Sequence, residues 1–212
     1  MDLTIAHQFD DLDQQQDAVT LGMWVFLATE ILFFGGMFLG YAVYRGMYHA
    51  AFAAASERLD IVFGTLNTAI LLCSSLTMAM GVHQAQLNNR RMLAIFLILT
   101  MILGAVFLGI KFYEYHQKFE ERLIPGAGFK WDGPDSEHAS LFFLFYFVMT
   151  GMHALHMIIG IGLMTVLLIL SLKRKITSIY YTPIEAGGLY WHFVDIVWVF
   201  LFPLLYLVDR SA

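Results

Sequence analysis

Five long apolar segments, separated by polar connections, dominate the hydrophobic pattern of this 212-residue chain. A helix of about 20 mainly apolar residues crosses the hydrocarbon core of a bilayer, and each segment reaches that length. We therefore expect an all-α, polytopic membrane protein in which residues 18–212 form a five-helix transmembrane bundle. The expected spans cover about residues 18–44, 61–84, 92–116, 139–172 and 188–208.

The polar connections differ in length and composition. Residues 1–17 are polar and acidic and contain no Lys or Arg, which is unlike a cleavable signal peptide, so we expect them at the interface or in water. Residues 45–60 form a short connection, and Arg90 and Arg91 indicate a tight turn before the third span. Residues 117–138 contain several Gly and Pro residues and predict a long surface loop. Another loop, with Pro183, is expected before the fifth span.

The composition supports the membrane class and excludes others. The chain is 59% hydrophobic and 14% charged, whereas soluble domains are about 25% charged. A net charge of −5 argues against nucleic acid as a partner, because no basic surface is available to neutralise phosphates. Cys73 is the single cysteine in the sequence, which excludes an intrachain disulfide and a cysteine metal cluster.

Basic residues favour one orientation of the spans. Five spans place the two termini on opposite sides of the membrane. With the N-terminus inside, five basic residues are cytoplasmic and six are external, but the cytoplasmic ones form compact clusters beside the spans. The positive-inside rule therefore favours a cytoplasmic N-terminus. The inner residues are Arg90, Arg91, Lys173, Arg174 and Lys175, and the outer ones are Arg45, Arg58, Lys118, Arg122, Lys130 and Arg210.

Ionisable side chains within the apolar spans are the candidate functional residues. Glu30, His153, His156 and Asp195 fall near the middle of their spans, and His192 lies nearer an end of the last one. Such groups are costly at that depth, on the order of 2.5–3.5 kcal/mol for a central Asp, and persist where a neighbour satisfies them. His192 and Asp195 are three residues apart and share a helical face, so the last span is expected to face protein and not lipid.

Two interpretations of these groups remain open at this point. His153, His156, Asp195 and Glu30 have the side chains that a buried iron, manganese or zinc site needs. The alternative is a set of satisfied polar contacts between helices, with Glu30 in a proton pathway. Glu114, at the end of the third span, is a further candidate for a structural or proton-related polar group, and a snorkelling charge or a cap is a simpler explanation of it than a catalytic role.

Small and aromatic residues indicate how the spans pack. Gly36 and Gly40 have the small-xxx-small spacing that lets another helix approach closely. The aromatic residues are most simply lipid-facing or interfacial side chains. This expectation covers Phe33, Phe34, Phe142, Phe143, Trp191 and Trp198.

Several segments resemble a known family. The sequence YWHFVDIVW at 190–198 resembles the last helix of cytochrome c oxidase subunit III and its relatives among the haem–copper oxidases. Four more segments are similar to that family and follow its order along the chain: GMWVFLATEILFF at 22–34, LNTAILL at 66–72, FYEY at 112–115 and TGMHALHMIIG at 150–160. The mitochondrial form has seven helices, so this chain resembles the five-helix bacterial members.

The resemblance implies a non-catalytic core subunit of a proton-pumping terminal oxidase that reduces oxygen to water, most simply cytochrome c oxidase. It implies haem and copper in the partner subunits I and II and no catalytic, cofactor or metal residue in this chain, so activity belongs to the complex. The buried His and carboxylate groups then become bundle-internal contacts, with Glu30 influencing proton supply to subunit I. Further partners implied are membrane lipids, a bound phospholipid and a larger respiratory supercomplex, in the bacterial plasma (inner) membrane.

Three alternatives accompany this interpretation. Subunit III of a quinol oxidase and a homologue associated with nitric-oxide reductases share much of the helix pattern. The alternative of another class is a stand-alone intramembrane metalloenzyme that uses His153, His156, Asp195 and Glu30.

Overall fold

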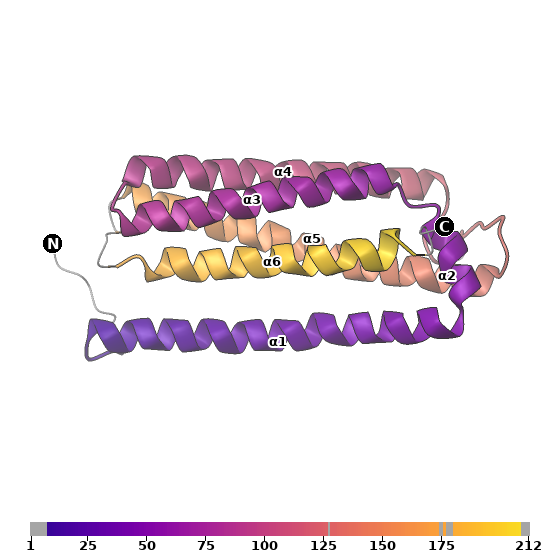
Figure 1. The fold of residues 1–212 in the computed structure, drawn as a ribbon, viewed down its shortest axis with the longest axis horizontal. Coiled ribbons are helices and arrows are strands. Elements are labelled where there is room, and N and C mark those ends of the chain that lie inside the picture. The colour runs from indigo at the N-terminus through magenta and orange to yellow at the C-terminus, as the bar shows by residue number, and fades with distance from the viewer. Residues whose placement is uncertain (1–7, 127, 174–175, 177–179, 209–212) are drawn as a thin grey trace.

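The computed structural model describes residues 8–126, 128–173, 176 and 180–208, and in these residues the fold is all-helical. Five of the six helices there are long and apolar enough to cross a membrane, which confirms the predicted class of a multi-pass helical membrane protein (Figure 1). The helices are α1 (Leu12–Met47), α2 (His49–Ser56), α3 (Ile61–Gln86), α4 (Arg90–Glu120), α5 (Ser136–Leu172) and α6 (Thr182–Tyr206).

Short polar side chains define where four of the long helices begin. Asp11, Asp60, Asn89 and Asp135 each accept a hydrogen bond from a backbone N–H of the first turn, a group that would otherwise lack an intrahelical partner. The cap at Asp11 makes residues 12–17 helical, although the sequence places them in the polar segment before the first span. Residues 1–7 of that segment, Arg174, Lys175 and the terminal Asp209 and Arg210 lie outside the described residues.

Two connections are more helical than the sequence predicts. The connection at 45–60 contains α2, whose Ala51, Phe52 and Ala55 are buried where α2 packs on α5. The expected loop around Pro183 is instead the first turn of α6, since a proline there removes only an N–H that has no intrahelical partner. The predicted turn at Arg90 is confirmed, and Asn88 takes the left-handed conformation (φ 56°) within it.

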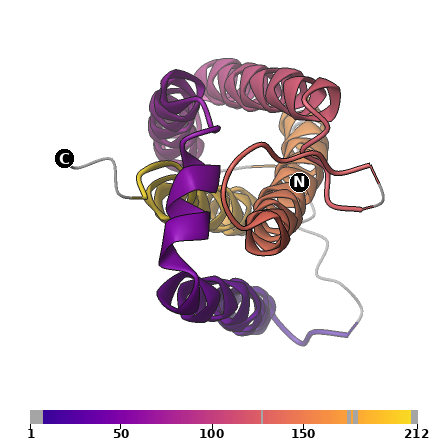
Figure 2. The ribbon, with the colours of Figure 1, turned by 90° about the vertical axis from the view of Figure 1, so that its right-hand side faces the viewer.

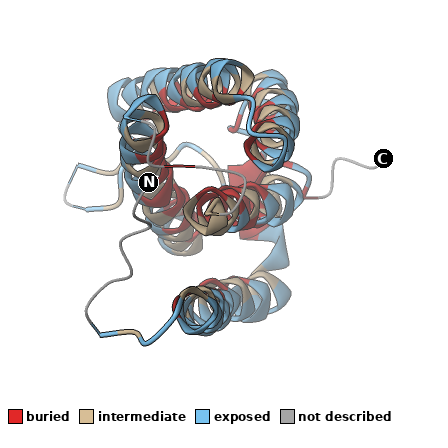
Figure 3. Ribbon diagram, turned by 90° about the vertical axis from the view of Figure 1, so that its left-hand side faces the viewer, coloured by how far each residue is buried: buried red, intermediate tan, exposed pale blue. Residues whose placement is uncertain are grey.

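The helices are arranged as a four-helix group with one helix beside it. Helices α3, α4, α5 and α6 pack around a common interior, and α1 runs along the outside of this group (Figures 1 and 2). In the most apolar 18-residue window of each span, 56% of α6 is buried but only 11% of α1. The buried faces point inward in the end-on view (Figure 3). Helix α6 is therefore the centre of the molecule, in agreement with the expectation from His192 and Asp195 that the last span faces protein.

The expectation that the aromatic residues face lipid is wrong for five of the six. Phe34, Phe142, Phe143, Trp191 and Trp198 are at most 2% exposed, while Phe33 is 44% exposed. These side chains fill the bundle through ring-to-ring contacts, such as the 4.8 Å edge-on packing of Phe107 on Trp198. Aromatic rings therefore supply the core of this bundle and not its lipid boundary.

The predicted loop at 117–138 is shorter than expected because α4 continues to Glu120 and α5 begins at Ser136. Part of the loop is packed against the helices: Leu123 is buried, and the Arg58 guanidinium lies 5.5 Å from the Trp131 ring centroid. This loop and α2 together cover the end of the bundle opposite the N-terminus of α1 (Figure 2).

Candidate functional site: polar groups inside the bundle

Glu30 of α1 and His156 of α5 form a pair between the outer helix and the bundle. Glu30 Oε2 lies 3.2 Å from His156 Nε2, and His156 Nδ1 lies 2.8 Å from the Met152 carbonyl oxygen. A carbonyl only accepts, so Nδ1 carries a proton. The contact at Nε2 then needs a further proton, donated either by an imidazolium ring to the carboxylate or by a protonated carboxyl group to a neutral ring. The pair therefore holds one exchangeable proton between two side chains.

The surroundings of this pair fix the histidine but leave the carboxyl group accessible. The Tyr190 hydroxyl donates to the His156 backbone carbonyl at 3.0 Å, and the Phe34 ring packs edge-on at 5.2 Å. The His156 side chain is 10% exposed and the Glu30 side chain 19%. The Glu30 side chain is thus the more exposed member of the pair, whereas His156 is held in place.

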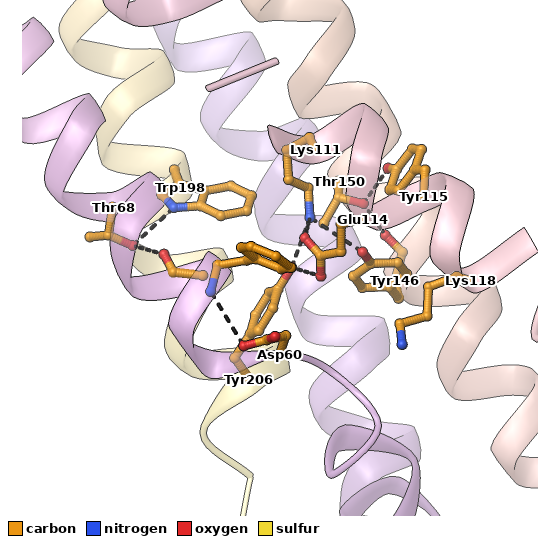
Figure 4. Close-up of polar contacts among 12 residues, drawn as sticks. Asp60, Thr68, Lys111, Glu114, Tyr115, Lys118, Tyr146, Thr150, Trp198 and Tyr206 are labelled. Atoms are coloured by element: carbon orange, nitrogen blue, oxygen red, sulfur yellow. Dashed lines mark hydrogen bonds and ion pairs between the residues drawn. The ribbon is translucent and has the colours of Figure 1, made fainter. Parts of the chain in front are cut away.

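A second polar cluster lies deep in the four-helix group, around Lys111 (Figure 4). The Lys111 ammonium donates to Glu114 Oε2 at 2.9 Å, to the Tyr206 hydroxyl at 2.7 Å and to the Tyr146 hydroxyl at 3.3 Å. Tyr206 in turn donates to Glu114 Oε1 at 2.6 Å. All three ammonium protons and both carboxylate oxygens thus have partners.

This cluster corrects the interpretation of Glu114 as a snorkelling charge or cap. Glu114 is fully buried and Lys111 is 3% exposed. Aromatic rings surround the ammonium at 5.0–5.5 Å, a distance at which a cation is attracted to the ring face. Lys111 is not among the candidates predicted from the sequence, although its position three residues before Glu114 places both charges on one helical face.

The last span places its two ionisable residues against α3. His192 Nδ1 lies 2.6 Å from the Ser75 hydroxyl. Asp195 is 4% exposed, and neither carboxylate oxygen has a hydrogen-bond partner among the described residues. The Ser75 hydroxyl interacts with the Asp195 carboxyl group as well, although its short hydrogen bond is the one to the His192 ring.

His153 faces the interior and not α1. Its ring lies 5.4 Å from the Phe107 ring and 5.2 Å from the Trp198 ring, and neither ring nitrogen has a partner among the described residues. His153 and His156 thus point to different surroundings although they are three residues apart. Within the described part of the chain, no three His, Cys, Asp or Glu side chains are grouped so that they could hold a metal ion. The four-residue metal site therefore receives no support from the geometry.

The two glycines of the small-xxx-small pattern differ in their surroundings. A Cβ on Gly40 would lie 3.6 Å from the Phe145 ring of α5, whereas one on Gly36 would meet nothing within 4 Å. Gly40 therefore contributes to packing inside this chain, and Gly36 remains on the exposed side of α1.

An open groove of about 440 Å³ lies between α1, α3 and α6, at the end of the bundle where α1 begins. Its lining is mainly apolar and includes Met23 and Val82. Two ionisable residues also line it: His192 and Glu185, whose carboxylate accepts a hydrogen bond from Gln86 at 3.3 Å. The groove suits an apolar chain with a polar end.

Comparison with known proteins identifies one family over nearly the whole chain. The family model described as "Cytochrome c oxidase subunit III" matches residues 6–209. Cytochrome c oxidase subunit 3 of Thermostichus vulcanus is 33% identical over 204 residues, covering 95% of this chain and 92% of the relative. Quinol oxidase subunit 3 of Bacillus subtilis is 32% identical over 193 residues, covering 91% and 88%. Cytochrome c oxidase subunit 3 of Loxodonta africana is 32% identical over 205 residues, covering 90% and 70%.

Proposed function

The chain belongs to the cytochrome c oxidase subunit III family, and from this premise we propose that it is a non-catalytic core subunit of a respiratory terminal oxidase. In this proposal subunits I and II carry the haem and copper and reduce oxygen to water. This chain packs beside subunit I, stabilises it and supports proton uptake. The polar groups inside the bundle then serve structure and proton supply and not catalysis.

The observation that supports a role in proton supply is the Glu30–His156 pair. Glu30 is a carboxyl group in the middle of a span, on the helix with the least buried window. Its partner ring is fixed by the Met152 carbonyl, and one proton is shared between them. A proton held in this way at the surface of the bundle is accessible to a neighbouring subunit.

The electron donor depends on the partner subunits. Relatives named for cytochrome c oxidase and for quinol oxidase match this chain at 33% and 32% identity over similar lengths. We propose cytochrome c as the electron donor and keep quinol as the alternative. Subunit II distinguishes the two, because in a cytochrome c oxidase it would carry the copper site at which electrons enter.

Purification of the complex through this chain tests the proposal. Native membranes are solubilised in mild detergent, and both the co-purifying subunits and the reduced-minus-oxidised spectrum are recorded. We expect haem bands and two larger partner subunits. A copper domain in one of these partners would indicate cytochrome c as the electron donor, and its absence would indicate quinol. Partners of a nitric-oxide reductase would support that homologue instead. A lone chain without haem but with bound metal would overturn the subunit assignment.

Replacement of Glu30 tests its role in the complex. We expect Glu30→Ala to leave the haem content intact and to lower the assembled fraction or the turnover sustained over many cycles, because it removes the proton-holding partner of His156. His156→Phe should have the same effect, since both variants remove the same pair. Glu120→Ala is the matched control, because the Glu120 side chain is 69% exposed. Unchanged assembly together with unchanged sustained turnover in both variants would contradict the role.

The surroundings of the subunit complete the proposal. We place the chain in the bacterial plasma membrane with a cytoplasmic N-terminus, in contact with membrane lipids and within a larger respiratory supercomplex. The apolar groove between α1, α3 and α6 is the proposed position of a bound phospholipid chain.

A further inference from the structure

Three buried side chains of the four-helix group have polar atoms that make no close hydrogen bond within the described part of the chain, and Asp195 among them has the Ser75 hydroxyl nearby. Asn67 is fully buried, His153 is 1% exposed and Asp195 is 4% exposed. Both polar atoms of the Asn67 amide, of the His153 ring and of the Asp195 carboxyl group lack a hydrogen-bond partner there. Each such group carries the full cost of desolvation when it stays unsatisfied. Buried polar groups of this kind are usually satisfied by a protein group or by an ordered water.

The helix register places Asn67 and His153 at one level of the interior. The Ser74 hydroxyl of α3 donates to the Thr100 carbonyl of α4. These helices run antiparallel, so the residue seven before Ser74 on α3 is level with the residue seven after Thr100 on α4. Asn67 therefore lies at the level of Phe107. Phe107 is the residue whose ring packs on His153.

Helix α6 brings Trp198 and Asp195 to the same region. The Trp198 indole packs on His153 at 5.2 Å and donates at 3.1 Å to Thr68, the residue after Asn67. Asp195 lies about one turn before Trp198 on the same helix. The three groups therefore come from three helices near the level of Phe107 and Trp198, with Asp195 about one turn away along α6 and beside Ser75.

The polar groups nearest to this region already have their hydrogen bonds. The three ammonium protons of Lys111 are donated to Glu114, Tyr146 and Tyr206. The Thr68 hydroxyl accepts from Trp198 and donates to the Gly64 carbonyl at 2.8 Å. The donor protons of these side chains are therefore not available to the open acceptors.

The charges of the region decide which ligand fits. A metal cation is disfavoured for two reasons. Asp195 would be its one carboxylate ligand, and the positive Lys111 ammonium lies 5.1 Å from the same Trp198 ring that contacts His153. Water is neutral, both donates and accepts, and typically makes about three hydrogen bonds to buried polar groups. We propose that the interior of α3–α6 binds structural water at the level of Trp198, held by Asn67 and His153 and extending to Asp195.

Direct observation of the site is the first test. In a cryo-EM map of the native oxidase complex, at a resolution that shows water, we expect density at hydrogen-bond distance, about 2.7–3.2 Å, from the Asn67 amide and a His153 ring nitrogen. A map in which these atoms bond directly to one another, or to other protein groups, with no density between them would overturn the proposal.

X-ray radiolytic footprinting of the wild-type complex gives a second, independent test. Radicals formed from bound water modify the side chains that the water touches. Phe107 and Phe142 are a matched pair, because both are fully buried phenylalanines, but the rings around Phe142 belong to Tyr41, Phe52 and Phe143. We expect modification of Phe107 several-fold faster than that of Phe142. Equal protection of the two would count against internal water.

A variant links the water to Asn67. Asn67→Leu keeps a similar volume and removes both polar atoms. In the assembled complex it should lower modification of Phe107 and leave Phe142 unchanged, while an unaltered Phe107 rate would show that Asn67 does not hold the water. Because the first two measurements use the wild-type complex, the proposal remains testable if this variant fails to assemble.

Discussion

At the scale of single residues, the bundle contains two kinds of buried polar group. The Lys111 cluster is closed, since the charges of Lys111 and Glu114 neutralise one another and their hydrogen-bonding atoms have partners. Breaking such a pair leaves one uncompensated buried charge, which costs about 3–5 kcal/mol, whereas removing both charges together costs much less.

We therefore expect Lys111→Met to lower the thermal unfolding midpoint of the purified complex strongly. The double variant Lys111→Met/Glu114→Gln should recover most of the loss, because Gln keeps an acceptor for Tyr206 without leaving a charge. Glu120→Ala, which breaks an exposed pair with His116 on the same helix, should change the midpoint little. A double variant less stable than Lys111→Met would contradict this account.

Residue spacing predicts only coarsely which helical face a side chain occupies, and it does not predict which residue that side chain contacts. Positions three apart differ by roughly 60° around a helix. On α5 that angle separates His156, which meets α1, from His153, which meets Trp198. The sequence correctly indicates that α6 faces protein, but the partners of Asp195 and Glu114 depend on helix neighbours that one sequence does not define.

At the scale of helices, glycines set how closely the elements approach. A Cβ on Gly104 of α4 would lie 2.8 Å from the Trp191 ring, and one on Gly160 of α5 would lie 3.0 Å from it. The ring cannot easily move, because its N–H donates to Ser74 at 3.0 Å. Tryptophan is enriched at membrane interfaces, so the sequence alone favours a boundary position, and only the packing of three helices shows the buried one.

We expect Gly104→Ala to destabilise the subunit by about 1–3 kcal/mol, as overpacking of a filled core usually does. Gly109→Ala on the same helix is the matched control, because its Cβ would meet nothing within 4 Å. The yield of assembled complex and its thermal midpoint measure both effects. Equal behaviour of the two variants would show that Trp191 has room to shift.

At the scale of the whole molecule, all connections lie at the two ends of the bundle. The α3–α4 turn and the first residues of α1 share one end, and α2 and the loop before α5 share the other (Figure 1). The predicted orientation follows from the compact basic cluster at the first end, with Arg90 and Arg91 beside the turn.

Cysteine labelling in intact cells measures this orientation. In a Cys73→Ser background we introduce Leu87→Cys in the α3–α4 turn or Ile124→Cys in the loop before α5, two exposed apolar positions at opposite ends. A membrane-impermeant maleimide should label Ile124→Cys in intact cells and Leu87→Cys only after permeabilisation. The reverse pattern would place the N-terminus outside.

The docking of α1 on the last helix has a consequence for biosynthesis. The Tyr41 hydroxyl donates at 2.6 Å to the carbonyl of Leu204, which lies 163 residues later in the chain. At a synthesis rate of about 5–20 residues per second, this partner emerges roughly 8–30 s after Tyr41. His156, the partner of Glu30, is also made 126 residues after it. During translation α1 is therefore made before the helices that it packs against, and the Glu30 carboxyl group has no His156 to pair with until α5 has been synthesised.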